Sequence, residues 1–282
     1  MPVATLTAGS PVSEAYARLT AAVPGMRVTE LSACDPVPRG AGWVGADELA
    51  AGGDALAAFL AWDDAQVLRD HGRRGRPDVI AGFGLHRYAW YACLLVTAPW
   101  FLLRRVPTVP VAGTAFHRTE RRLAVRTEGF ACLPDDPAAG LPGARVVADE
   151  AGLRAEVRTA VAAHFAPLLD GFGPRLRRGR RAQWGMATDE VVDGLWYLAQ
   201  RLGEEDRARA ELELLLPANQ AAPYTGAPGF RNLTAPDGRE LPTRDRVSCC
   251  LSYTLDPADT CLSCPRTSDA ERLRRMTEEA AC

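Results

Sequence analysis

The sequence contains no lysine, so all 33 of its lysine-or-arginine positions are arginine. A chain without lysine cannot carry the G-x-x-x-x-G-K-[ST] phosphate loop. The sequence also lacks a G-x-G-x-x-G fingerprint after a predicted strand and the G-x-S-x-G elbow of many hydrolases. These absences argue against a bound NAD or flavin and against serine-nucleophile chemistry. Any electron that the protein uses must therefore come from another protein.

Composition and charge indicate an ordinary globular protein that binds no nucleic acid. The chain has 282 residues, of which 47% are hydrophobic and 24% charged, and its formal net charge is −2. This length allows one large domain or two small ones, and a nearly neutral chain is not a general nucleic-acid binder. Residues 1–5 include no basic region leading into an apolar core, so no secretory signal is visible. We therefore expect a cytoplasmic location.

One long uncharged run raises the question of a membrane span. Residues 88–103 carry no charge, but a spanning helix needs about 20 apolar residues. Pro99 lies inside the run, and Arg104 and Arg105 follow it directly. We expect a core helix that kinks or ends near Pro99, and peripheral contact with the inner membrane remains open.

Four cysteines near the C-terminus form the pattern C-C-x10-C-x2-C. They are Cys249, Cys250, Cys261 and Cys264. Four thiolates within sixteen residues are a complete ligand set for an iron–sulfur cluster or a structural zinc ion. A disulfide or redox pair is the alternative, which a reducing cytosol disfavours. The other cysteines are scattered along the chain, at Cys34, Cys93, Cys132 and Cys282.

The adjacent cysteine pair favours a two-iron cluster over a single zinc ion. Cys249 and Cys250 lie in a strand-like apolar run, residues 247–253. Neighbouring side chains on a strand point to opposite faces, so both sulfurs reach one centre only if the backbone bends there. A two-iron cluster tolerates a wider spread of sulfurs than one zinc ion does. Nearby backbone N–H groups and the hydroxyls of Ser248 and Ser263 are expected to donate hydrogen bonds to sulfur.

The cysteine pattern resembles the C-terminal signature of the FhuF-type ferric siderophore reductases. The basic-x-Ser lead-in at residues 246–248 is similar to that family, as are residues 181–187, where Met186 stands in place of the usual Asn. A third likeness is the apolar helix around residues 84–90, so the resemblance covers about residues 75–270.

The resemblance implies a [2Fe–2S] cofactor held by the four cysteines, and a ferric-siderophore reductase that needs no catalytic residue beyond the cluster. Such a protein passes one electron to iron(III) in a siderophore, often of hydroxamate type, and iron(II) is released in the cytoplasm. It would receive its electron from an external donor such as a ferredoxin or a reductase. The alternative is a non-catalytic siderophore carrier with a structural zinc or iron–sulfur site.

Several arginines and one tryptophan are candidate substrate contacts. Arg118 and Arg121 lie at a predicted hairpin, where they could contact hydroxamate oxygens or simply form an exposed turn. A dense basic run at residues 175–181 includes Arg178 and Arg181; it suits an anionic siderophore, an acidic ferredoxin, a lipid surface or plain solvent. Trp184 could stack on a ligand, although a core position is favoured.

The hydrophobic patterns predict a mainly helical α+β protein with a small central antiparallel sheet and a C-terminal iron–sulfur lobe. We predict a siderophore-interacting body at residues 1–240 and a [2Fe–2S]-binding segment at residues 241–282. Strands are expected at 108–111, 115–117 and 122–126. A helix from 153 is expected to break at Gly171–Pro174, and residues 217–246 are expected to be rich in loops, with a turn at Asp237 and Gly238.

Overall fold

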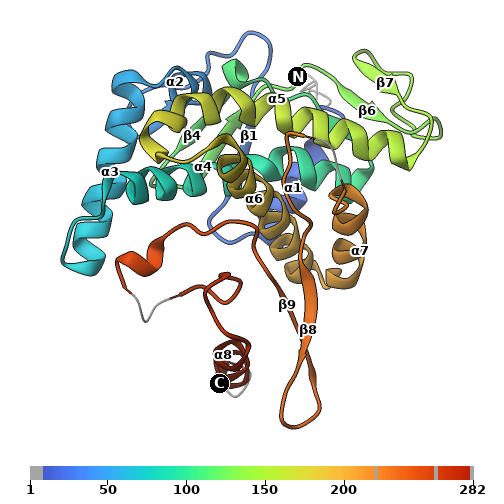
Figure 1. Ribbon diagram of the computed structural model, residues 1–282. Coiled ribbons are helices and arrows are strands. Elements are labelled where there is room, and N and C mark those ends of the chain that lie inside the picture. Colours follow the sequence, from blue (N-terminus) through green and yellow to red (C-terminus); the bar gives the residue numbers. More distant parts are fainter. Residues whose placement is uncertain (1–8, 220–221, 257–259, 280–282) are drawn as a thin grey trace, which may run out of the picture.

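The computed structural model describes residues 9–219, 222–256 and 260–279, and Figure 1 shows how the helices surround a long central helix. Residues 1–5 and 280–282, which entered the sequence predictions, lie outside the described residues. The helices are α1 (Ser13–Ala22), α2 (Ala46–Ala51), α3 (Gly53–His71), α4 (Pro77–Leu103), α5 (Glu150–Leu176), α6 (Arg180–Leu202), α7 (Glu205–Leu215) and α8 (Asp269–Glu279). This confirms the mainly helical α+β class.

The strands form three small sheets rather than one. They are β1 (Arg27–Glu30), β2 (Trp43–Gly45), β3 (Val106–Pro107), β4 (Thr114–His117), β5 (Arg122–Val125), β6 (Phe130–Cys132), β7 (Ala144–Val146), β8 (Phe230–Thr234) and β9 (Glu240–Arg244). The sheet orders are β1-β5-β4-β2, β3-β6-β7 and β8-β9. The pairs β4–β5 and β2–β4 are antiparallel as predicted, but β1–β5 and β6–β7 are parallel.

The predicted strand at residues 108–111 is wrong. Thr108 exchanges two backbone hydrogen bonds with Glu128 and Gly129, and the chain then turns into a short 3-10 helix, Val111–Gly113. Proline supplies no backbone donor, so Pro107 and Pro110 limit how far the pairing can extend.

The long apolar helix α4 is the centre of the core and does not end at Pro99. Tyr88, Trp100 and Phe101 on it are fully buried. A proline inside a helix leaves the carbonyl four residues earlier without its usual donor; here that carbonyl belongs to Leu95, and the Tyr16 hydroxyl donates to it at 2.9 Å. By length and composition α4 could cross a membrane, but 72% of its most apolar window is buried in the protein, as in a core helix.

Helix α5 also continues where a break was predicted. It passes Gly171 and Pro174 and ends at Leu176, with Phe172 and Leu176 fully buried. A side chain at Gly171 would lie 2.4 Å from the Leu49 carbonyl oxygen of α2. The glycine is thus a contact point between two helices, and tertiary packing outweighs its low helix propensity.

Part of the predicted loop at residues 217–246 is an antiparallel hairpin of β8 and β9. Its turn lies at the predicted position, with Gly238 at φ 83°. In Figure 1 this hairpin and α8 extend from the same side of the helical body. The division at residue 240 coincides with the start of β9 and stays a prediction.

Candidate metal centre

The four cysteines of the motif lie on a loop that we call the cysteine loop, residues 246–266. The strand-like run at residues 247–253 is not a strand; the chain is irregular there and enters a 3-10 turn at Ser252–Thr254. Leu251, directly after the adjacent pair, has φ 65°, a left-handed conformation that is uncommon for a residue with a side chain. This is the backbone bend that the pair was expected to need. Cys264 closes the second pair with a bond from its N–H to the Cys261 carbonyl, 3.0 Å long.

The four cysteines of the loop form no disulfide, and their thiols interact with one another. Cys249, Cys250 and Cys261 are half-buried and Cys264 is buried. Burial raises the pKa of Cys261 to about 12, although the nearby Arg246 works against this, and the Cys250 and Cys264 thiols raise it further. Burial likewise raises the pKa of Cys249, which also interacts with Cys264 and Cys250. A bound metal must displace these protons.

Backbone N–H groups point at two of the sulfurs. The N–H of Leu251 lies 3.4 Å from Cys249 Sγ, and that of Arg266 lies 3.4 Å from Cys264 Sγ. In each case the donor is two residues after the cysteine. The Ser252 hydroxyl lies 3.4 Å from Cys250 Sγ. The predicted role of Ser248 is wrong, because its hydroxyl donates to Asp189 Oδ2 at 2.7 Å instead.

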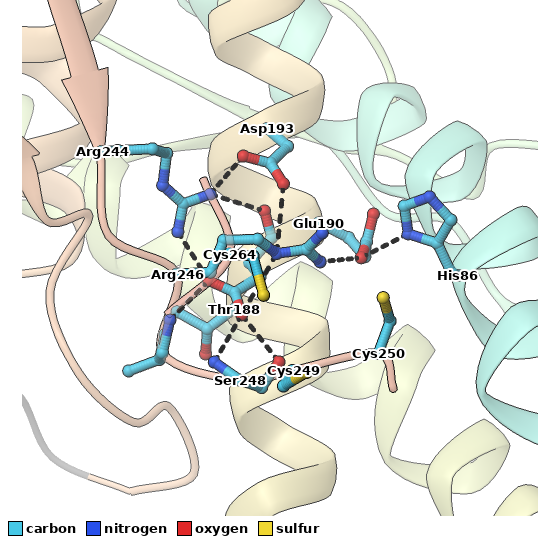
Figure 2. A network of polar contacts seen from close by, with 12 residues as sticks. His86, Thr188, Glu190, Asp193, Arg244, Arg246, Ser248, Cys249, Cys250 and Cys264 are labelled. Atoms are coloured by element: carbon cyan, nitrogen blue, oxygen red, sulfur yellow. Dashed lines mark hydrogen bonds and ion pairs between the residues drawn. The ribbon is translucent and has the colours of Figure 1, made fainter. Parts of the chain in front are cut away.

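Asp189 anchors the cysteine loop to α6. Its side chain is fully buried and accepts from the N–H of Val247 at 2.9 Å and from the N–H of Ser248 at 2.8 Å. The guanidinium of Arg244, also fully buried, donates to Asp189 Oδ1 at 2.5 Å. Figure 2 shows Arg244, Arg246 and Ser248 gathered beside α6. The entrance to the loop is therefore fixed by one carboxylate with four donors.

A second buried carboxylate carries this network toward α4. Arg246 donates to Glu190 Oε1 at 2.8 Å, and the same oxygen lies 2.6 Å from His86 Nδ1. Burial disfavours the charge of Arg246, but Glu190, Asp193 and Asp189 outweigh it and raise the pKa of the guanidinium. Glu190 likewise raises the pKa of His86 against the effect of burial. A cation is thus held beside the thiols, where Arg246 interacts with Cys261.

The sequence reasoning missed Asp189, Glu190 and Arg244. The available signal was an acidic pair inside an otherwise apolar helical stretch, directly before Val191 and Val192. Two carboxylates on a helix that the pattern buries need cationic or N–H partners.

The donor set fits an iron–sulfur cluster. Thiolates are the soft ligands that such clusters and zinc both take. Among the residues that the structure describes, no three His, Cys, Asp or Glu side chains are placed to bind a single metal ion. A two-iron cluster needs less convergence, because its two irons share the four thiolates.

Comparison with known families decides between these metals. The family model of the FhuF 2Fe-2S C-terminal domain matches residues 246–266, which is the whole cysteine loop. Over these residues the loop is similar to the FhuF-type 2Fe-2S domain. The cofactor is therefore a [2Fe–2S] cluster, and the resemblance to the siderophore reductase family is confirmed. No curated protein matches the chain.

Contact with the cysteine loop also explains why residue 185 is glycine, in the middle of the stretch 181–187 that resembles the family. A side chain at Gly185 would lie 3.4 Å from Ser248 Cβ and 3.3 Å from Thr225 Oγ1. Glycine there lets the cysteine loop approach the backbone of α6. The flanking Trp184 and Met186 are both buried.

The structure distributes the predicted substrate contacts over four places. Arg178 lies at the FhuF-type domain and donates to the Cys249 carbonyl at 2.6 Å. Arg121 lines a cavity beside His86. Arg118 instead donates to the Ala58 carbonyl of α3 at 3.0 Å.

Trp184 and Arg181 line a separate hollow with Tyr224. The Trp184 side chain is 4% exposed and packs edge-on against Tyr224, with ring centroids 5.6 Å apart. This is the core position that the sequence favoured. Whether any of these residues contacts a substrate stays a prediction.

Proposed function

We propose that this protein reduces iron(III) held in a siderophore of hydroxamate type by one-electron transfer, with release of iron(II) in the cytoplasm. The family match supports an iron–sulfur oxidoreductase, and the observation that carries the proposal is the set of four adjacent thiols on the FhuF-type loop. Three of them are only half-buried, so the site lies near the surface, where a bulky chelate can come close.

The cluster supplies the electron, and the protein supplies the charges and hydrogen bonds around the sulfurs. When bound, a [2Fe–2S] cluster supplies one electron at a potential set by charge, hydrogen bonds to sulfur and solvent exposure. Arg246 places a buried positive charge beside Cys261, and the N–H groups of Leu251 and Arg266 point at cysteine sulfurs. All three favour a more negative, reduced centre. Iron(II) is bound by siderophores far less tightly than iron(III), so the reduced substrate lets its metal go.

The electron enters, on this proposal, at the basic turn between α5 and α6, residues 175–181. Arg178 in that turn bonds the backbone of Cys249, so the turn adjoins the cluster ligands. Its other arginines are exposed to solvent: Arg175, Arg177, Arg180 and Arg181. A surface of one charge sign attracts partners of the other, which supports an acidic donor such as a ferredoxin.

The test begins with protein purified without oxygen. A brown protein containing two irons and two sulfides per chain, bleached by dithionite and re-oxidised by a ferric trihydroxamate, is the expected result. The iron(II) formed should appear with a ferrous chelator in equal amount to the re-oxidised cluster. The gallium(III) complex of the same ligand is the matched control, since gallium(III) takes no electron here. A colourless protein with one zinc would instead support the carrier alternative.

A further inference from the structure

A second basic turn contacts the cysteine loop. It joins α3 to α4 at residues 72–76, and we call it the α3–α4 turn. All of its arginines are exposed: Arg73, Arg74 and Arg76. Arg73 donates to the Thr254 carbonyl of the cysteine loop at 3.3 Å, and in Figure 1 the 3-10 turn of that loop lies next to the end of α3. Two basic turns therefore border the loop, this one and residues 175–181.

The two basic turns meet at a small hollow between α3, α4 and α5, which we call the α3–α5 hollow. Its volume is about 340 Å³, and its lining includes Arg74 from the first turn and Arg175 from the second. Much of the remaining wall is aliphatic: Ala57, Leu60, Ala61, Pro77 and Ile80. The hollow therefore suits an apolar side chain whose neighbours carry negative charge.

Carboxylates offset only part of the positive charge of this surface. The ion pairs are Asp64–Arg74, Asp78–Arg76 and Asp170–Arg180. Four other arginines of the two turns form no ion pair within the described ranges: Arg73, Arg175, Arg177 and Arg181. All four are exposed, so the surface keeps an excess of positive charge that faces solvent.

The surface also adjoins the ligands of the cluster. Arg178 donates to the Cys249 carbonyl at 2.6 Å, and a side chain at Gly75 would lie 3.6 Å from the Leu255 side chain. A protein seated across both turns is therefore separated from the backbone of a cluster ligand by one arginine side chain. Outer-sphere electron transfer needs no bond between the partners, so this proximity is sufficient.

We infer that the α3–α4 turn and residues 175–181 form a single docking surface for an acidic one-electron protein, which inserts an apolar side chain flanked by carboxylates into the α3–α5 hollow. The inference rests on the proposed reductase function and specifies how its electron donor binds. The donor loses one electron and the cysteine-bound centre gains it, and no proton is transferred.

The chemistry of the surface favours a protein donor. Opposite charges steer the encounter, and electron-transfer pairs often bury less than about 1,200 Å², so one apolar anchor within a charged rim is enough. The chain lacks NAD and flavin fingerprints, so the electron must arrive on another protein.

Binding between two oxidised proteins tests this surface without electron transfer. Calorimetry should show that the cluster-loaded protein binds an oxidised, acidic plant-type [2Fe–2S] ferredoxin. The affinity should fall steeply between about 0.01 M salt, where the Debye length is about 30 Å, and about 1 M, where it is about 3 Å. Arg74→Glu in the α3–α4 turn should weaken binding about tenfold. Ala61→Trp, which fills the hollow, should weaken it without changing any charge.

Each variant has a matched control. Arg239→Glu makes the same charge change at the exposed turn between β8 and β9. Ala58→Trp adds the same bulk to an exposed position of α3 outside the lining of the hollow. Both controls should bind the ferredoxin as wild type does.

Wild-type affinity in either Arg74→Glu or Ala61→Trp would overturn the inference, as would a wild-type protein that does not bind the ferredoxin. Arg74→Glu that loses only its binding to phosphatidylglycerol vesicles would assign the surface to a membrane and also overturn it. If dithionite-reduced protein is still re-oxidised by a ferric trihydroxamate in these cases, the docking surface fails while the reductase function stands. If no re-oxidation occurs, the function itself fails.

Discussion

The helical body and the cysteine loop are held in place by opposite kinds of interaction. The body is organised around α4, whose buried residues are almost all apolar. The cysteine loop and its flanks are fastened by arginines that the protein buries almost completely, Arg244, Arg246 and Arg272. Arg272 of α8 donates to the Cys264 carbonyl at 2.9 Å and to Asp245 at 2.7 Å.

The two regions are stabilised differently because they differ in length. The cysteine loop, residues 246–266, is too short to bury a core of its own, so it is held by hydrogen-bonding partners from the body and by the metal cluster. Arginine suits this task because its planar group donates five bonds in fixed directions. The body should therefore survive changes that release the loop, whereas the loop depends on the body.

Loss of the cluster should affect the cysteine loop strongly and the helical body very little. Cys261→Ser should remove iron and sulfide from the purified protein and abolish re-oxidation by ferric hydroxamate. Its far-UV circular dichroism should keep most of the wild-type helical signal, because the helices α1 to α7 contain none of the four ligands.

Cys34→Ser is the control, since Cys34 is exposed and lies outside the loop. It should retain the wild-type iron content. Global loss of helix in Cys261→Ser would show that the body depends on the cluster, which would contradict the independence of the body from the loop.

Weakening the anchor should release the loop without unfolding the helices. Asp189→Asn leaves the buried Arg244 with less compensating charge, and breaking a buried ion pair costs about 3–5 kcal/mol. Chelator challenge should strip iron from this variant at least about tenfold faster than from wild type, while the helical melt shifts little.

Leu198→Ala on the same helix is the contrasting variant. Leu198 is fully buried in the core, and such a truncation costs about 2–5 kcal/mol. Here iron loss and helix melting should move together. Identical behaviour of the two variants would mean that loop and body unfold as one unit.

Acid should destabilise the body through a buried histidine. His164 of α5 packs against α4, where its Nδ1 bonds the Val109 carbonyl at 2.8 Å and its Nε2 lies 2.7 Å from the Tyr88 hydroxyl. Burial lowers the pKa of His164 to about 4, below its unfolded value of about 6.5. The unfolded chain binds a proton between these values that the folded chain does not, so stability falls as pH falls from about 6.5 to about 4, by about 3 kcal/mol.

Urea unfolding at about pH 7, 5.5 and 4.5 measures this loss. His164→Gln should flatten the acid limb, since glutamine does not titrate. An unchanged pH slope in that variant would assign the acid sensitivity to other groups.

The two regions also differ in how far the sequence could predict them. Period-2 patterns located β4 and β5 closely, and the cysteine spacing located the cluster. The continuation of α4 past Pro99 could not be predicted, because the donor that satisfies the Leu95 carbonyl comes from Tyr16, 79 residues away along the chain. Asp189 and Arg244 form a pair 55 residues apart, and no local pattern reports such a contact.

The smallest expected effect concerns the potential of the cluster rather than its presence. The Ser252 hydroxyl lies 3.4 Å from Cys250 Sγ, and a hydrogen bond to a ligand sulfur stabilises the reduced centre. Ser252→Ala should lower the midpoint potential by about 20–60 mV, the equivalent of one net hydrogen bond of about 0.5–1.5 kcal/mol in a one-electron couple. Redox titration followed by visible absorbance measures the shift. Ser268→Ala, at the start of α8 where its hydroxyl meets the Glu271 N–H, should leave the potential unchanged. Equal potentials in all three proteins would show that the backbone N–H groups alone tune the sulfurs, and Ser263→Ala then tests the remaining hydroxyl of the loop.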